Sequence, residues 1–162
     1  LRFLQESMTS DVTDGYLRGS SALFQSWVVF SSYFDDIQVD LQSMEQRTKN
    51  SLLATTCTSF MISANTLRLV FPHMNSDGHG GVTGGTWSPL AKRLEGQRIV
   101  VNGTVRFDWD SVNRRVTRIM STSDMITAML QVVDSLDGVS YIFNGARVTP
   151  DCRLVGQNEY LS

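Results

Sequence analysis

The chain has 162 residues, of which 41% are hydrophobic and 19% are charged, so a disordered chain is excluded and one domain with a sizeable core is expected. Fourteen Lys and Arg residues against sixteen Asp and Glu residues give a net charge of −2, which argues against non-specific nucleic-acid binding by the domain as a whole. No apolar run approaches the ~18 residues of a transmembrane helix. Because no basic stretch followed by an apolar core opens the given sequence, no signal peptide is expected there.

The first residue and the cysteines indicate the origin and the compartment of the chain. Because the chain begins at Leu1 and not at Met, we expect a piece of a longer protein or a mature fragment. Cys57 and Cys152 are far apart, and two distant cysteines form neither a disulfide framework nor a zinc site. The sequence therefore predicts reduced thiols in an intracellular protein, with no metal and no cofactor.

Two helices are predicted near the N-terminus. Leu1, Leu4 and Met8 have helical spacing, and residues 9–11 end this first helix. Ser20-Ser21 offers an N-cap for a second helix of about three turns. The apolar stripe of this second helix consists of Leu23, Trp27, Phe30 and Phe34.

Two strands and a short helix follow. Residues 36–42 alternate between polar and apolar side chains, which is the period of a half-buried strand. After a turn at 48–50, the Thr-rich residues 51–63 predict a second strand, antiparallel to the first. Asn65 is predicted to cap a short helix that Pro72 ends.

The glycine-rich segment 73–87 is predicted to be a mobile loop, serving either as a lid or as a plain linker. Ser88 and Pro89 then have the character of an N-cap and a first helical residue. Gly96 stands where the glycine that ends such a helix belongs.

The longest strand pattern covers residues 97–110, and after a turn at 110–113 the residues 114–122 predict the returning strand. Ser123 or Asp124 is expected to cap one last long helix that runs to Leu136 and is broken by Asp137-Gly138. Long antiparallel strands with helices on one side, and no strand–helix–strand crossovers, predict an α+β domain.

Several segments resemble the nuclear-transport-factor-2-like (NTF2-like, or cystatin-like) superfamily, and in particular its polyketide-cyclase-like members. These segments are SDV at 10–12, ALFQSWVVFSSYFDDIQVDLQSM at 22–44, LEGQRIVVNGTVRFDWD at 94–110 and RVTRIMSTSDMITAMLQVV at 115–133. The resemblance implies a cone in which a curved antiparallel sheet wraps around a long helix with further helices. It also implies one domain over 1–155, with the glycine-rich loop 75–87 inserted and a tail at 156–162.

A narrower resemblance concerns the region downstream of the basic leucine zipper in oomycete transcription factors. It is carried by FPHM at 71–74, the segment at 94–110 and LDGVSYIFNGARVTPDCRL at 136–154. It implies a non-catalytic module of a nuclear regulator that dimerises, binds a partner protein or senses a small apolar ligand. The sequence has no sustained heptads and no basic run, so no direct DNA contact by this domain is expected.

Cone folds of this kind enclose an apolar pocket, and by resemblance they pair into homodimers through their sheets. The residues predicted to line the pocket are Trp27, Phe30, Phe34, Val39, Leu41, Phe60, Ile62, Val101, Val105, Phe107, Trp109, Met120 and Met125. The opposite strand face is polar, so any association through it would form a wet interface. The residues expected on that face are Arg98, Asn102, Thr104 and Arg106.

An isomerase, cyclase or dehydratase would need an acid or base in this pocket. His73 and His79 lie off the predicted strand faces, and the histidine of the cyclase-like members falls where this chain has non-titrating residues at 119–120. The acid of those members falls near Asp124, so Asp124 and Asp11 are the catalytic candidates, although an Asp before a helix also serves as a cap. A pocket enzyme of this kind and a transport or scaffold adaptor remain the alternatives to a non-catalytic regulator module.

Overall fold

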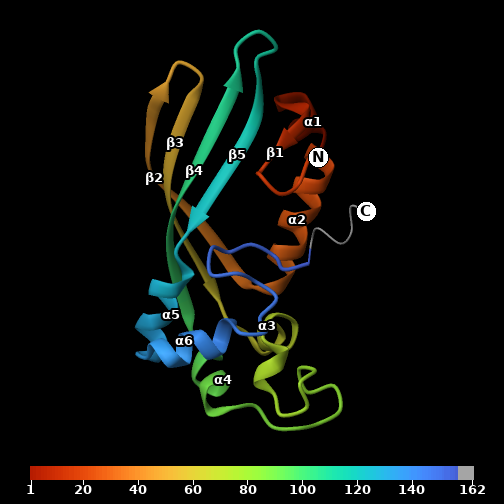
Figure 1. Ribbon diagram of the computed structural model, residues 1–162, viewed down its shortest axis with the longest axis vertical. Helices are drawn as coiled ribbons and strands as arrows, with labels where there is room; N and C mark the ends of the chain where they lie inside the picture. Colours follow the sequence, from red (N-terminus) through yellow and green to blue (C-terminus); the bar gives the residue numbers. More distant parts are fainter. Residues whose placement is uncertain (157–162) are drawn as a thin grey trace.

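The computed structural model describes residues 1–156 and shows a long twisted sheet with helices packed against it (Figure 1). The sheet has five strands in the order β1-β5-β4-β3-β2. This mixed arrangement confirms the predicted α+β fold. The elements are α1 (Arg2–Ser7), β1 (Met8–Thr13), α2 (Ser20–Tyr33), β2 (Asp35–Thr48), β3 (Ser51–Met61), α3 (Ala64–Val70), the 3-10 helix η1 (Pro72–Met74), α4 (Pro89–Leu94), β4 (Arg98–Asp110), β5 (Arg115–Ser123), α5 (Met125–Val133) and α6 (Leu136–Phe143).

Strand β1 was not predicted, and it makes the sheet mixed, because it pairs with β5 in parallel. Residues 9–11 do not simply end the first helix but lie inside this strand. Met8 and Val12 are buried beneath it, while Ser10 and Asp11 are exposed. Two apolar positions separated by three polar residues give no readable alternation, so only the neighbouring β5 shows that this segment is a strand.

Two helices begin one or two residues away from their predicted caps. Gly19, with φ of 93°, is the residue before α2, and Ser20 already lies in the helix. Ser63 caps α3 in place of Asn65, because its hydroxyl accepts the Thr66 N–H while the Thr66 hydroxyl accepts the Ser63 N–H. This reciprocal capping box satisfies two N–H groups, one more than a lone Asn cap would satisfy.

The C-terminal helix is shorter than predicted and a second helix follows it. Asp134 takes a left-handed conformation with φ of 54° and ends α5. The Ser135 hydroxyl then accepts the Gly138 N–H and caps α6. Asp137 and Gly138 therefore lie in the first turn of a helix and do not break one.

Two hydrophobic clusters cover different parts of the inner sheet face. The larger one packs α3, α4, α5 and α6 against the ends of β3 and β4, where Phe60 and Ile99 are buried. The smaller one packs α1, β1 and α2 against β5, where Met8, Val12 and Ile119 are buried. In Figure 1 the larger cluster lies at the lower end of the sheet and the smaller one beside its upper half. The inner face between them has no helix directly on it.

The glycine-rich loop is held by one carboxylate. Asp77 accepts the backbone N–H groups of His79, Gly81 and Thr83, at 2.7 Å, 3.0 Å and 3.0 Å. Burial would raise the pKa of the Asp77 carboxyl, but these hydrogen bonds outweigh it and hold the pKa at about 2. Figure 1 shows the loop beyond α3 and α4, at the lower end of the molecule.

Within residues 1–156, no helix is long and apolar enough to span a bilayer.

Phe60→Ala tests the larger cluster. Phe60 is 1% exposed and its ring centroid lies 4.4 Å from that of Phe34. We expect the free energy of unfolding, measured in urea, to fall by about 3–5 kcal/mol. Leu41→Ala, on the exposed strand β2, is the control and should change stability by less than about 0.5 kcal/mol. Equal effects of the two substitutions would contradict this description of the core.

Candidate functional site: an open cavity on the sheet

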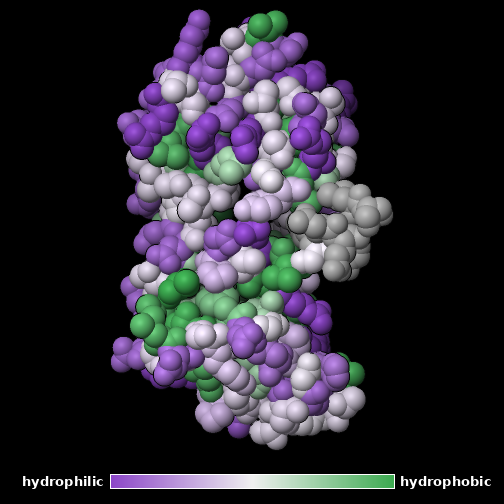
Figure 2. Space-filling model, in the orientation of Figure 1, coloured by the Kyte–Doolittle hydropathy of each residue, from purple (hydrophilic) through white to green (hydrophobic). Residues whose placement is uncertain are grey.

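A cavity of about 540 Å³ occupies the uncovered part of the inner sheet face. Strands β2 to β5 form one wall, α2 forms the second, and the segment 149–156 crosses as the third. Figure 2 shows the surface hollowed at mid-height on this side of the molecule. The cavity exists because the two helical clusters stop short of one another.

The structure places six of the predicted lining residues along this cavity. Two come from the apolar stripe of α2, and the other four come from the sheet. They are Trp27, Phe30, Val39, Phe60, Val101 and Val105. Phe30 meets Phe60 edge to face, with ring centroids 6.4 Å apart, so helix and sheet join in an aromatic floor.

Three other predicted lining residues lie in the larger hydrophobic cluster instead. Phe34, Ile62 and Met125 are fully or almost fully buried there. Phe34 lies behind Phe30, with ring centroids 5.0 Å apart. Periodicity identified these side chains as inward-facing, but it could not show that four short helices fill the lower end of the sheet and cover them.

The remaining four predicted lining residues also lie outside the cavity. Phe107 packs into the smaller cluster under β1 and α2. Leu41 is 58% exposed on β2, and Trp109 follows a bulge and lies near the hairpin tips. Met120 pairs with Arg106 on the outer face, since one residue along a strand reverses the side-chain direction.

The polar wall of the cavity was missed by the sequence analysis. It consists of the segment around Asp151 to Arg153 and of Asp14 and Tyr16 from the loop before α2. The Arg153 guanidinium lies 3.9 Å from the centre of the Tyr16 ring, and its Nε donates to Asp151 at 2.7 Å. The stacked guanidinium ties the C-terminal segment to the N-terminal part of the chain.

The ionisable groups of this wall are already satisfied by hydrogen bonds. Burial raises the pKa of the Asp151 carboxyl, but hydrogen bonds from Arg153 and Thr149 outweigh it and lower the pKa. Asp14 accepts the backbone N–H groups of Tyr16 and Leu17 at 2.8 Å and 2.7 Å. The Asp151 carboxyl therefore lacks the raised pKa that a general acid needs near neutral pH.

Burial raises the pKa of the Cys152 thiol from its ordinary value of 9.0 to about 12. At neutral pH this thiol is therefore un-ionised and a poor nucleophile. The described residues 1–156 contain no group of three His, Cys, Asp or Glu side chains that could hold a metal ion.

The predicted catalytic candidates are not among the side chains that line the cavity. Asp124 is the N-cap of α5, where its carboxylate accepts the backbone N–H of Thr127 at 3.0 Å and also the Thr127 hydroxyl. These hydrogen bonds lower the pKa of the Asp124 carboxyl. Asp11 is exposed on β1, next to the buried Val12. Neither carboxylate lines the cavity, so neither one stands where a pocket acid was expected.

Both histidines also lie elsewhere. His73 is in η1, with its Nε2 atom 3.1 Å from the Tyr141 carbonyl oxygen. His79 is exposed in the glycine-rich loop. None of the residues of that loop lines the cavity, so the loop is not a lid over it in this structure.

Solved structures with the same fold are SnoaL-like polyketide cyclases and related proteins. A SnoaL-like polyketide cyclase of Agrobacterium tumefaciens is 14% identical, with a TM-score of 0.53 over 80% of this chain and 82% of that one. TsrD of Streptomyces laurentii is 12% identical, with a TM-score of 0.53 over 83% of each chain. IdmH of Streptomyces antibioticus is 13% identical, with a TM-score of 0.51 over 83% and 86%.

These similarities confirm the NTF2-like cone predicted from the sequence. At such low identity they establish the fold alone, because one fold supports many unrelated functions. No protein-family model matches the chain, and no curated protein matches it either.

Two substitutions at Asp124 distinguish a role as helix N-cap from a role as catalytic acid. Asp124→Ala should lower the free energy of unfolding by about 1 kcal/mol, because the Thr127 N–H loses its acceptor. Asp124→Asn should change the free energy of unfolding by less than about 0.5 kcal/mol, because Asn also caps helices. Urea unfolding at pH 7 measures both changes. Because the folded-state pKa of Asp124 is lowered, the difference between wild type and Asp124→Ala should shrink as the pH falls below 3.8. Equal losses in both variants would contradict the cap.

The Cys152 thiol gives a prediction at alkaline pH. Because its folded-state pKa is raised, its contribution to stability is present below pH 9 and is lost as the pH rises toward 12. Relative to Cys152→Ser, the wild-type protein should lose roughly 1 kcal/mol of unfolding free energy between about pH 9 and about pH 10. Parallel pH profiles of the two proteins would show that the thiol is not buried.

Proposed function

We propose that this domain binds a small, neutral and largely apolar molecule in the cavity and does no chemistry on it. The observation that carries the proposal is the cavity itself, whose volume of about 540 Å³ lies within the usual range of small-molecule sites. Its aromatic floor of Trp27, Phe30 and Phe60 offers apolar contact area. Ligand sites of this kind combine an apolar lining with a few fixed polar groups.

The charge of the lining favours a neutral ligand. Asp14 and Asp151 are carboxylates and Arg153 is a cation, and the Arg153 guanidinium already binds Asp151. An anionic ligand would therefore meet more negative than positive charge. The uncharged polar side chains are hydroxyls, which suit a ligand with carbonyl or hydroxyl groups. These hydroxyl residues are Ser26, Ser31, Thr56, Thr58, Ser121, Ser123 and Thr149.

The ionisable side chains of the cavity support a role without catalysis. Asp151 has a lowered pKa, and Cys152 has a pKa of about 12. Acid–base catalysis needs a group poised near the working pH. The carboxylate of Asp151 beside Arg153 is the feature that would best suit the cyclase or isomerase alternative, because a carboxylate can accept a proton. An adaptor for transport or scaffolding would need no occupied cavity at all.

The wider setting of the domain is also a proposal, and it rests on the sequence resemblance to regulators with a basic leucine zipper. In that setting the domain would act in the nucleus as a homodimer. Binding of a ligand or of a partner protein would then regulate the transcription factor. Reading the coding sequence upstream of Leu1 tests this setting. A basic region followed by heptads supports it, and an open reading frame without them removes it.

The ligand prediction is tested with a matched pair of substitutions. Thr56 lines the cavity, whereas its neighbour Thr55 pairs with Thr104 on the outer face. We expect neutral polycyclic ketones and alcohols to quench Trp27 fluorescence and to raise the melting temperature. Thr56→Phe should fill part of the cavity and weaken binding by at least about tenfold, and Thr55→Phe should change it less than about twofold.

Two results would go against the proposal. If no neutral compound in a broad panel shifts the melting temperature of wild type, the adaptor alternative is favoured. If a bound compound is converted to product and Asp151→Asn stops the conversion without loss of binding, the enzyme alternative is favoured. Trp27→Phe serves as the spectroscopic control, because Trp87 and Trp109 lie outside the cavity.

A further inference from the structure

We propose that two copies of this chain pair edge to edge through β2, so that their sheets join into one continuous sheet. The occupant of this edge is a second copy of the chain, related by a two-fold axis and running antiparallel. This inference does not depend on which molecule the cavity binds.

The first observation is that β2 is a long and uncovered edge. It spans fourteen residues at the end of the sheet. Within residues 1–156 it is hydrogen-bonded to β3 on one side. All of its residues except Ile37 are exposed. Monomeric proteins usually shorten, bend or cover such an edge, because its free N–H and C=O groups attract another strand. Nothing in the described part of the chain covers it.

The second observation is the apolar side chains that this edge exposes. Val39 is 62% exposed and Met44 is 55% exposed. Both face the inner side of the sheet, since Val39 pairs with Thr58 and Met44 pairs with Ala54, which lie on that side. A second strand laid along the edge would cover these side chains.

The third observation is the position of the bulges along the strand, since the register with β3 shifts near each end, between Asp35 and Gln38 and between Gln46 and Thr48, and again at the middle. Leu41 pairs with Thr56 and Ser43 pairs with Thr55, so Gln42 is an extra residue. Odd-numbered positions face inward before the bulge, and even-numbered positions face inward after it. The bulge therefore lets β2 pair with its own copy so that Val39 lies opposite Met44 of the second copy. Inner side chains then meet inner side chains over residues 37–46, between the two outer bulges.

The charges of β2 select this register. It brings Asp36 close to Arg47 of the second copy on the outer face, where each lies in an outer bulge of its strand, and the two-fold axis repeats the pair. Shifting the register by two residues in one direction would put Asp36 opposite Glu45, and shifting it in the other direction would put Asp40 opposite Glu45. Like charges directly opposite each other destabilise paired strands. Of these three registers, only the central one brings opposite charges together without such a repulsion.

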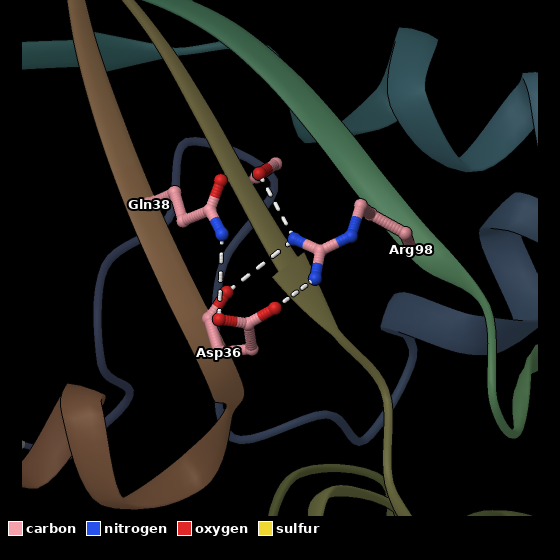
Figure 3. Close-up of polar contacts among 4 residues, drawn as sticks. Asp36, Gln38 and Arg98 are labelled. Atoms are coloured by element: carbon pink, nitrogen blue, oxygen red, sulfur yellow. Dashed lines mark hydrogen bonds and ion pairs between the residues drawn. The ribbon is translucent and has the colours of Figure 1, made fainter.

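The side chains of Asp36 and Arg47, which would meet between the two copies, lie on the outer face of the sheet. Arg98 of β4 reaches across β3 to bind the Asp36 carboxylate, and it also donates to the Ser59 hydroxyl at 3.0 Å (Figure 3). The Asp36 side chain is still 56% exposed, so a second cation has access to it. Arg47 lies near Glu45, at 3.7 Å, on the same face.

Edge pairing would also change the cavity. Val39 lines the cavity at its open side, next to the free edge. The partner copy would place Met44 against Val39 and so add an adaptable apolar side chain to the rim. The open side of each cavity would then be bounded by the second copy.

Cysteine cross-linking tests the register in the full chain. Cys57→Ser removes the partly exposed native thiol on the outer face. In that background Val39→Cys with Met44→Cys should give a disulfide-linked dimer under mild oxidation, because directly opposite residues have Cβ atoms about 5 Å apart. Val39→Cys alone should stay unlinked, because the two copies of residue 39 would lie about 17 Å apart.

Two further measurements keep the proposal open to refutation. Leu41→Cys with Met44→Cys represents the shifted register and should not cross-link. In sedimentation velocity, Arg47→Glu should raise the dimer dissociation constant by about tenfold or more, whereas Arg114→Glu at the far hairpin should change it less than about twofold. Circular dichroism checks that these surface variants remain folded.

Three outcomes would overturn the inference. The first is a wild-type chain that remains monomeric at about 100 μM, well above the range of specific dimers. The second is equal cross-linking of the 39/44 and 41/44 pairs. The third is a dimer that dissociates on Thr104→Arg and not on Arg47→Glu, which would show that the copies pack through their outer sheet faces.

Discussion

The cavity depends on the contact between the α2 helix and strand β3. Phe30, Phe34 and Phe60 form one aromatic cluster, with centroid distances from 4.4 Å to 6.4 Å. This cluster fixes the helix against the lower half of the sheet, and the inner face between the larger and the smaller hydrophobic clusters stays uncovered. Because Phe34 and Phe60 are buried while Phe30 is only half-buried, the same cluster serves as core on one side and as cavity floor on the other.

The second constraint is electrostatic. The segment 149–156 forms a wall of the cavity, where Leu154 packs against the larger cluster and Arg153 stacks on Tyr16 and binds Asp151. Hydrogen bonds lower the pKa of Asp151, so the wall stays charged and structured at neutral pH. A cavity whose charged groups already have hydrogen-bond partners within the chain suits binding of a neutral molecule better than acid–base chemistry. An apolar floor, hydroxyl groups and charged groups that are already hydrogen-bonded are the basis of the proposed function.

The edge of the sheet connects the cavity with assembly. Val39 belongs both to the cavity lining and to the exposed strand β2. A second copy seated on this strand would therefore alter ligand access as well as oligomeric state. Ligand binding and dimerisation would then be coupled, since a ligand that contacts residues of both copies stabilises the dimer that holds them.

The sequence by itself determined the α+β class, the two long hairpins and the caps of the later helices. Alternation over 36–42 and 97–110 is a local property, and the Asp124 and Ser88 caps act within one turn of their helices. It also identified the α2 stripe, from which Trp27 and Phe30 reach the cavity. Only the tertiary structure decided which inward-facing residues line the cavity and which are covered, because Phe34, Ile62 and Met125 have the same pattern as Phe60 and Val101. It also decided the parallel strand β1 and the polar wall at Asp151 to Arg153, since both depend on partners more than a hundred residues away in the chain.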